Sequence, residues 1–489
     1  MRSSFLRLAF VAAAILSGAA AADEKSISAT LNTPFKVIAD KNRSYRTVFD
    51  AVMQLKAPPV PLSLTFGPTS VWPGMAGWDK VSAWAKDNQA VGAALLKAQD
   101  CIALGMPYGS AIEPKYQEAG LWVRIGTEET IAEVQFPYLD KMRLMATWAV
   151  AEMYRLGGEG KFDDAFNLAV ANLRVLRQGC DQRTLREKVT FMQLLAECAS
   201  ANRDFMWANL AKIPAESFQK ASLKGYSFLR QTDNERLKRL ELPEGDKEIQ
   251  MAVLAETFGP DGQADPDKFA AVWGGLQAKQ APLTAFGAAK RWRLIATVHG
   301  SLDASQKRLG VIYDDWWRRW RMRPFDSMLE LATELSRTNT TKYAAVVFSV
   351  TDLQAAFDLR MRLVAEVNGT AVSAALCGFY KAEKDTWPSL LSKVFPTYGI
   401  KRFNYDPFDK RQDLRGVPEP GPFEYRQLSS PAKVNTEWGQ ITISGCILYS
   451  KGADSRDDGA TDHSSEAKAD DFILFPPPRA VARQEGKLK

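Results

Sequence analysis

Histidine is nearly absent from this chain, and its scarcity excludes most catalytic and metal sites that depend on it. The 489 residues include only His299 and His463. The sequence has no H-E-x-x-H motif, no G-x-S-x-G elbow, no P-loop and no G-x-G-x-x-G fingerprint. We interpret His299, in "TVHGS" beside an expected helix end, as a capping residue, and His463 as a solvated residue of an acidic loop. No complete catalytic constellation is therefore predicted.

Cysteine is also scarce, and no C-x-x-C pair occurs. The five cysteines stand at positions 101, 180, 198, 377 and 446. This spacing excludes zinc ribbons and thioredoxin-type motifs, and the density is too low for a disulfide framework. Cys180–Cys198 and Cys377–Cys446 are conceivable bridges, whereas free buried thiols are an equally open interpretation.

Long hydrophobic runs are missing after the first 22 residues. Residues 1–22 have the order of a signal peptide: Arg2 and Arg7, then "LAFVAAAIL", then small residues up to Ala22. The apolar run is shorter than the ~20 residues that span a bilayer. We predict cleavage between Ala22 and Asp23 and a periplasmic or secreted protein. We expect no later run to be long and apolar enough to span a bilayer, and therefore no transmembrane anchor after signal removal.

A strong charge of one sign is lacking as well. The formal net charge is +6, and loss of Arg2 and Arg7 with the signal peptide lowers it to +4. A balance this weak, together with export, argues against nucleic acid as a partner. The protein or envelope partner stays unknown at this level.

Helical periodicity dominates residues 23–342. Apolar residues recur at i, i+3 and i+4 from Leu139 to Leu156, and a second such face runs from Phe162 to Leu176. Glycines separate the two faces, which predicts an antiparallel αα-hairpin. The hairpin resembles the middle of a tetratricopeptide repeat, in one copy without the ~34-residue period. The expected fold class is mainly α, with irregular helical hairpins.

The sequence pattern changes after residue 342 from helical hairpins to a mixture of helix and strand. A long helix over about 345–383 is followed by turn-rich sequence and by the strand-like pieces "FEYRQL" and "QITISGCILYS", the second with a bulge at Gly445. We predict a small α+β module over 343–476, with a long helix and a short antiparallel sheet. Residues 477–489, "PPRAVARQEGKLK", are predicted to be a mobile tail.

This C-terminal region resembles the soluble module of type II secretion major pseudopilins of the G type. Three motifs carry the resemblance in the family's order: Tyr380, Trp387, Pro388 and Leu390; Asp406, Pro407, Phe408, Phe423 and Tyr425; and Tyr449, Ser450, Gly452, Ala453, Asp454, Gly459, Ala469 and Asp470. The chain departs from the family because a helical region precedes the module and the third loop is longer. Polymerisation is therefore not implied, and the arrangement looks like secreted bacterial proteins that join a helical region to a pseudopilin-like tail.

The resemblance implies a structural calcium ion in the loop between Tyr449 and Asp471. Asp454 and Asp470 would converge on the ion with the backbone carbonyl of Lys451, and Asp457, Asp458, Asp462 and Asp471 are further candidates. Seven acidic side chains lie in this span, and calcium prefers such oxygen ligands. The EF-hand register fails, because Arg456 and Ser465 occupy positions 3 and 12. A solvated acidic loop is the alternative.

Tryptophan-rich segments supply the remaining candidates. Trp72, Trp78 and Trp84 are expected to fill or cap a core, with a sugar-stacking platform as the sharper alternative. The run "YDDWWRRWRMRPF", 313–325, places Trp316 and Trp320 on one helical face. Its tryptophans are predicted to be core, with arginines solvated or paired to Asp314 and Asp315; an anionic-glycan or membrane-surface patch is the alternative.

These observations favour an exported, non-enzymatic interaction or scaffold protein of the cell envelope, with a calcium-stapled C-terminal module. The alternative is an exported glycan-acting hydrolase that uses paired carboxylates, which leave no sequence signature. A concave pocket with two facing carboxylates would favour the hydrolase, and tryptophans buried in the helical core would favour the scaffold.

Overall fold

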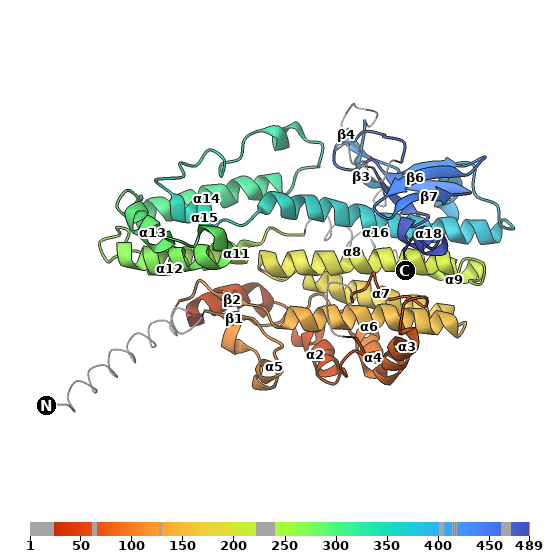
Figure 1. The fold of residues 1–489 in the computed structure, drawn as a ribbon, viewed down its shortest axis with the longest axis horizontal. Helices are drawn as coiled ribbons and strands as arrows, with labels where there is room; N and C mark the ends of the chain where they lie inside the picture. Colours follow the sequence, from red (N-terminus) through yellow and green to blue (C-terminus); the bar gives the residue numbers. More distant parts are fainter. Residues whose placement is uncertain are drawn as a thin grey trace.

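The computed structural model describes residues 24–60, 66–126, 130–221, 240–400, 405–412, 414, 416, 418–460 and 471–488. The predicted signal peptide and residues Asp462, His463 and Asp470 lie outside these ranges. Helices make up most of the described chain, and small antiparallel sheets lie near the C-terminus (Figure 1). The predicted fold class is confirmed.

Three long helices form the centre of the protein. They are α6 (Tyr138–Gly158), α7 (Phe162–Gly179) and α8 (Leu185–Ala208). α6 and α7 pack on each other as the predicted hairpin, and α7 packs on α8. A Cβ atom on Gly157 would lie 2.4 Å from the ring of Phe205, so glycine permits the close approach of α6 to α8. A capping box of Thr184 and Glu187 begins α8.

Shorter elements cover one side of these helices (Figure 1). They are α2 (Tyr45–Met53), α3 (Trp78–Asp87), α4 (Gln89–Ala98), α5 (Pro114–Glu118), β1 (Arg124–Ile125) and β2 (Val134–Gln135). Trp84 of α3 is buried, and its Nε1 donates to the main-chain oxygen of Lys56 at 2.9 Å. Trp72 and Trp78 are partly buried against the same core. The core interpretation of these tryptophans is confirmed.

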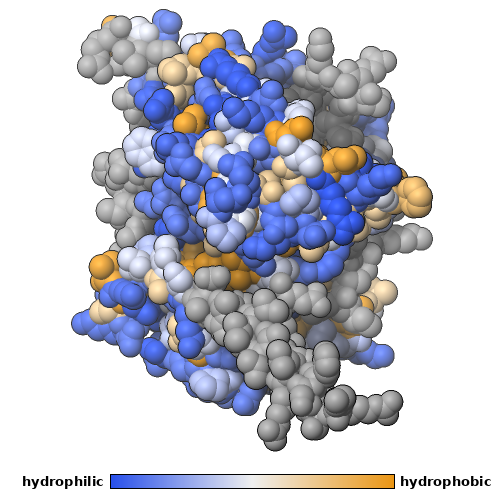
Figure 2. Space-filling model, turned by 90° about the vertical axis from the view of Figure 1, so that its left-hand side faces the viewer, coloured by the Kyte–Doolittle hydropathy of each residue, from blue (hydrophilic) through white to orange (hydrophobic). Residues whose placement is uncertain are grey.

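A second group of helices gathers at one end of the molecule (Figure 1). After α9 (Ala215–Lys220) come α11 (Glu244–Thr257), α12 (Pro266–Gln280), α13 (Ala288–Ala296), α14 (Leu302–Arg319) and α15 (Ala344–Ser349). Figure 2 shows this end as mostly hydrophilic, with hydrophobic residues scattered among hydrophilic ones. His299 lies buried behind it, and its Nε2 accepts from the backbone N–H of Ala345 at 3.2 Å. The histidine thus caps the first turn of α15.

The long helix predicted over about 345–383 is interrupted. It is divided into α15 and α16 (Leu353–Ala382), and Asp352 caps α16 through the N–H of Ala355 at 2.9 Å. By length and composition the span Ala344–Ala382 could cross a membrane, because an 18-residue window within it has a mean hydropathy of 1.2. This finding corrects the expectation that no later stretch qualifies. However, 89% of that window is buried inside the protein, as in the core helix of a soluble protein.

α16 joins the two predicted parts of the chain. It packs along α8, where Arg203 forms an ion pair with Glu366 and donates from Nη1 to Thr370 Oγ1 at 2.7 Å. One hydrophobic core includes residues from Ile27 to Phe475 and therefore crosses the predicted boundary at residues 342 and 343.

Small sheets cover the C-terminal half of α16 (Figure 1). After α17 (Phe395–Tyr398), the strands are β3 (Asp406–Gln412), β4 (Pro418–Gly421), β5 (Glu424–Gln427), β6 (Ala432–Thr436), β7 (Gly439–Ile443), β8 (Cys446–Ser450) and β9 (Phe472–Phe475). β3 pairs with β4, β6 with β7, and β8 lies between β5 and β9.

The bulge predicted at Gly445 is a crossing between sheets. β7 pairs with β6 before this glycine, and β8 pairs with β5 and β9 after it. Gly445 has a φ of +88°, and a Cβ there would lie 2.4 Å from Nε1 of Trp387. Both constraints favour glycine.

The tail predicted over 477–489 is instead folded as far as it is described. Pro478–Gln484 form helix α18, and Ala480, Val481 and Ala482 are buried. Arg483 forms an ion pair with Asp204 of α8 at 3.1 Å. Prolines at the start suit the first helical turn, and the apolar face packs on α8 and the sheet.

All five cysteines are free, and four are buried. Of the two open interpretations, free thiols hold, and neither Cys180–Cys198 nor Cys377–Cys446 forms a bridge. Burial raises the pKa of Cys180 to about 12, so this thiol stays protonated at neutral pH.

Candidate functional site

The loop after β8 begins with a lysine held among carboxylates. Lys451 Nζ lies 2.8 Å from Asp409 Oδ1 and 3.1 Å from Glu424 Oε1. The backbone N–H of Lys451 donates to Asp406 Oδ2 at 3.1 Å. Asp406 is fully buried and accepts a second bond from Ser450 Oγ at 2.9 Å. This network ties β3 to the end of β8, so it fixes where the acidic loop departs.

The predicted calcium ligands of the loop make contacts of their own. Asp454 Oδ1 accepts from the N–H of Arg456 at 2.9 Å, and Asp457 Oδ1 accepts from Tyr449 Oη at 2.8 Å. Asp457 also pairs with Arg426 at 3.1 Å. Asp454 and Asp457 therefore already have hydrogen-bond or ion-pair partners within the protein.

Asp471 was only a further candidate for a calcium ligand in the sequence analysis. Its Oδ2 accepts from the N–H groups of Asp458 and Ala460 at 3.0 and 2.9 Å. Its Oδ1 is buried and has no hydrogen-bond partner within the described chain. Burial, with the negative charges of Asp457 and Asp458, raises the pKa of Asp471 to about 6.

The described residues do not by themselves form a calcium site. No group of three His, Cys, Asp or Glu side chains among them could hold a metal ion. The loop brings Asp457 and Asp458 near Asp471, whereas Asp470 lies outside the described residues. A calcium site here requires ligands from the segment 461–470, and the prediction stays a prediction.

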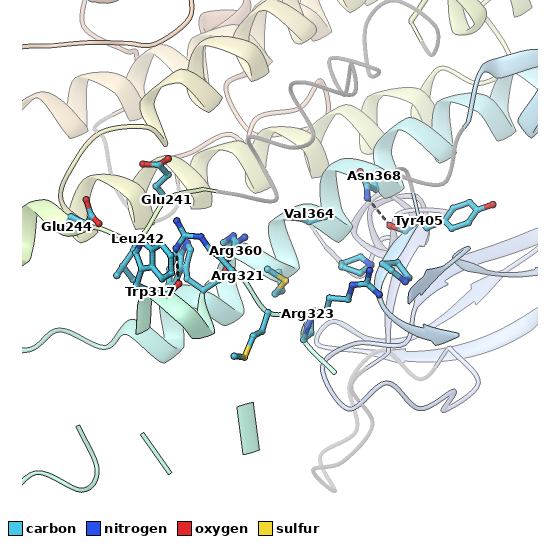
Figure 3. A pocket seen from close by; sticks show the side chains of 16 residues that line it. Glu241, Leu242, Glu244, Trp317, Arg321, Arg323, Arg360, Val364, Asn368 and Tyr405 are labelled. Atoms are coloured by element: carbon cyan, nitrogen blue, oxygen red, sulfur yellow. Dashed lines mark hydrogen bonds between the residues drawn. The ribbon is translucent and has the colours of Figure 1, made fainter. Parts of the chain in front are cut away.

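A cavity of about 670 Å³ lies elsewhere, between the end of α14, the middle of α16 and residues 240–244. Its volume lies in the range of small-molecule sites. The sequence run 313–325 supplies one wall, and β3 and β4 close one end (Figure 3). The apolar lining includes Leu242, Trp317, Trp320, Met322, Met361 and Val364, together with three prolines.

Arg360 is the buried charge of this cavity. The side chain is 3% exposed, and its Nη1 donates to the main-chain oxygen of Trp320 at 2.5 Å. Its Nε is buried without a partner, and no carboxylate among the described residues pairs with it. Burial, and secondarily the positive charge of Arg321, lowers the pKa of Arg360 to about 9.

Two tryptophans hold the basic side chains of the wall. Trp320 is buried, its Nε1 donates to the main-chain oxygen of Leu240, and its ring lies 5.2 Å from Cζ of Arg360. Trp317 is 46% exposed, and Cζ of Arg321 stacks 3.5 Å from its ring. The tryptophans therefore orient the guanidinium groups as well as fill space.

The run 313–325 is otherwise built as predicted. Trp316 and Trp320 are buried, and Arg319 lies 3.0 Å from Asp315 across one helical turn. Trp317 departs from the core prediction because it is exposed and lines the cavity (Figure 3).

Two carboxylates also line the cavity. Glu241 and Glu244 come from one short segment and lie at the same end of the cavity, with Arg323 toward the other end (Figure 3). Glu244 Oε2 lies 3.8 Å from Arg183 Nη1, so it is partly engaged outside the cavity. The lining, as far as the structure describes it, contains no His, Cys or Ser side chain.

Sequence reasoning missed Arg360. One signal was present: in "FDLRMRLV", Arg360 follows Phe357 by three residues and precedes Val364 by four, so it stands on an apolar helical face. A charged residue in the middle of a buried face indicates either an internal partner or a ligand.

A larger groove of about 930 Å³ runs along α4, α7 and α9. Its cations are already paired: Lys220 lies 2.6 Å from Asp163, and Arg174 lies 3.0 Å from Asp100. The groove thus lacks the unpaired buried charge that distinguishes the cavity at Arg360.

Comparison with protein families, with curated proteins and with solved structures returned no significant match for this chain.

Proposed function

We propose that this chain is an exported, non-catalytic binding protein of the cell envelope, and that the cavity beside Arg360 is its ligand site. One observation carries the proposal. A cavity of about 670 Å³ combines apolar and aromatic walls with a buried guanidinium that has no carboxylate partner among the described residues. Apolar walls with a few oriented polar groups are typical of small-molecule sites.

The test is ligand-dependent thermal unfolding of the mature protein, residues 23–489. A ligand that binds only the folded state raises the unfolding midpoint by mass action. We expect shifts with some members of a panel of small amphipathic molecules. Val364→Phe narrows the cavity and should abolish the shift, whereas Val311→Phe, at an exposed position of α14, should keep it. A panel without any shift would exclude the cavity as a site for such ligands.

The glycan-acting hydrolase is a second candidate, because Glu241 and Glu244 line the same cavity. Paired carboxylates can serve as acid and base in glycoside hydrolysis. The test is release of reducing ends from bacterial cell-wall glycans. Glu241→Gln and Glu244→Gln should each abolish activity if the pair is catalytic, and activity that survives both would exclude it.

The calcium staple belongs to the proposal as a structural feature of the C-terminal module. It is supported by the buried Oδ1 of Asp471, which has no partner in the described chain, and by the adjacent Asp457 and Asp458. Bound calcium would supply positive charge that offsets the carboxylates of the loop. The resemblance to the pseudopilin module is also part of the proposal. It is supported by a long helix packed on a small antiparallel sheet.

A further inference from the structure

We propose that Arg360 anchors the ligand of the cavity, and that this ligand is an organic anion: a carboxylate or phosphate monoester head on an apolar body. The inference rests on the proposed binding function, because it needs the cavity to be a ligand site. It adds the chemical class of the ligand and the residue that selects it.

Comparison among buried arginines singles out Arg360. Four arginines are buried in the described chain, and three of them have a carboxylate within 4 Å: Arg177 with Asp181, Arg203 with Glu366, and Arg319 with Asp315. Arg360 has no such carboxylate among the described residues: its Nη1 donates to the main-chain oxygen of Trp320, and its Cζ lies over the rings of Trp320 and Phe357. Burial of an uncompensated charge is costly, so charges inside proteins are normally paired. In this proposal, the ligand supplies the anion that the described residues do not provide.

The surroundings of Arg360 favour an anion further. Arg321 and Arg323 line the same cavity, and no ion pair to either is formed within the described residues. Arg321 is held in place by stacking on Trp317 and by a bond from Nη1 to the oxygen of Trp317 at 2.9 Å. A planar guanidinium offers parallel N–H donors that match a carboxylate or phosphate.

The rest of the lining specifies an apolar body. Leu242, Met322, Met361 and Val364 provide aliphatic and thioether contacts, and Trp320 provides an aromatic face. An inorganic anion would leave most of the cavity unfilled, whereas an alkyl or aryl chain would cover these walls and exclude water. Glu241 and Glu244 disfavour a second negative charge at their end of the cavity.

The experiment measures binding of four molecules that share one eight-carbon chain: octanoate, octyl phosphate, octanol and octylammonium. Isothermal titration calorimetry is performed on the mature protein, residues 23–489, at low ionic strength. Inorganic phosphate and acetate are titrated separately, because they carry the head without the chain. We expect octanoate and octyl phosphate to bind more tightly than octanol, octylammonium, phosphate and acetate.

Two variants locate the anion. Arg360→Met removes the charge and should weaken octanoate and octyl phosphate roughly tenfold to 100-fold, which corresponds to loss of a charge-assisted hydrogen bond. It should bind octanol no worse than the wild-type protein, which a misfolded variant could not do. Arg318→Met removes the same charge from an exposed position of α14 and should change nothing.

Each contrary outcome has its own meaning. Octanol that binds as tightly as octanoate would overturn the anion assignment and leave the proposed binding function intact. Phosphate that binds as tightly as octyl phosphate would overturn the apolar part of the ligand. Anion binding that persists in Arg360→Met would overturn Arg360 as the anchor. If no eight-carbon probe binds, and Val364→Phe has no effect on any ligand, the proposed function fails as well.

Discussion

Arg360 and Trp320 are fastened to each other at two points: Nη1 of the arginine donates to the main-chain oxygen of Trp320 at 2.5 Å, and Cζ lies 5.2 Å from the indole ring. Trp320 caps the C-terminus of α14, and Arg360 stands in the first third of α16. The contact therefore joins two helices through residues that are 40 positions apart in sequence. It holds a cation at the cavity wall in one orientation before any ligand arrives, which lowers the entropic cost of binding.

Arg360→Met should leave the ligand-free protein at least as stable as the wild type in urea unfolding. The substitution removes a buried charge without a carboxylate partner, whose burial is unfavourable, and loses one hydrogen bond to Trp320. Arg203→Met is the matched comparison, because Arg203 is equally buried but paired with Glu366. It should lower the free energy of unfolding by about 3–5 kcal/mol, since it leaves Glu366 buried without that partner.

Equal destabilisation by the two substitutions would show that Arg360 is an ordinary structural arginine. The site argument depends on the difference between them, and both variants are measured in the same buffer without added ligand.

The C-terminal helix should be required for stability. Arg483 donates from Nη2 to the oxygen of Thr69 at 2.6 Å and pairs with Asp204, which is 1% exposed. Arg483→Met weakens the compensation of this buried carboxylate and should lower the free energy of unfolding by about 3 kcal/mol, with Arg479 retaining part of it at 3.5 Å. Lys487→Met, in the same C-terminal segment, should cost far less. Equal unfolding midpoints in urea for wild type and Arg483→Met would contradict the docking of α18.

Periodicity predicted what depends on local sequence. The apolar faces of 139–156 and 162–176 became α6 and α7 because an i, i+3, i+4 pattern is legible without knowing the partner helix. Helix α18 was not predicted, because its formation depends on contacts with distant parts of the chain. "PPPRAVARQ" has three adjacent apolar residues in a short segment. They are buried only because α18 packs on α8 and the sheet, which the local sequence does not reveal.

The site shows the same division. The burial of Trp316 and Trp320 and the Asp315–Arg319 pair follow from helical spacing, whereas the exposure of Trp317 does not. The cavity does not follow from it either, because Arg360 and Leu242 reach it from segments far away in sequence. Gly445 was recognised as a point of irregularity, but the exchange of partners there depends on β6 and β5, which a single strand pattern cannot reveal.

The protonation of Asp406 should contribute to the free energy of unfolding in mild acid, and this contribution should disappear near neutral pH. Burial, with a smaller contribution from the negative charge of Asp409, raises the pKa of Asp406 from 3.8 to about 7, against the hydrogen bonds from Phe408, Ser450 and Lys451. The folded state thus keeps a proton that the unfolded chain releases. The resulting contribution is fully present below pH 3.8 and is lost as the pH rises through about 7.

Asp406→Asn removes that titration. We expect the difference in free energy of unfolding between wild type and Asp406→Asn to fall steadily from pH 4 to 7.5, measured by urea unfolding at each pH. The absolute stability of the variant can drop, because the amide accepts fewer bonds from Ser450 and Lys451. A difference that is constant across this range would show that Asp406 is ionised throughout.

Calcium should raise the unfolding midpoint of the mature protein relative to EDTA. The acidic loop concentrates carboxylates, and Asp471 presents a buried oxygen without a partner in the described chain. Because the pKa of Asp471 is raised to about 6, the proton competes with the ion, and the calcium-dependent shift should be larger at pH 7.5 than at pH 5. Asp454→Ala, Asp470→Ala and Asp471→Asn should each reduce the shift, whereas Asp314→Ala, at an exposed position of α14, should not.

Elemental analysis of the purified protein completes the calcium test. Retained calcium, together with a shift that depends on Asp454 and Asp470, would support the stapled module and the resemblance to pseudopilins on which it rests. The absence of both would make the loop a solvated acidic turn, because Asp454 and Asp457 already satisfy themselves through Arg456, Tyr449 and Arg426. The cavity at Arg360 would be unaffected, since none of its lining residues belongs to the loop.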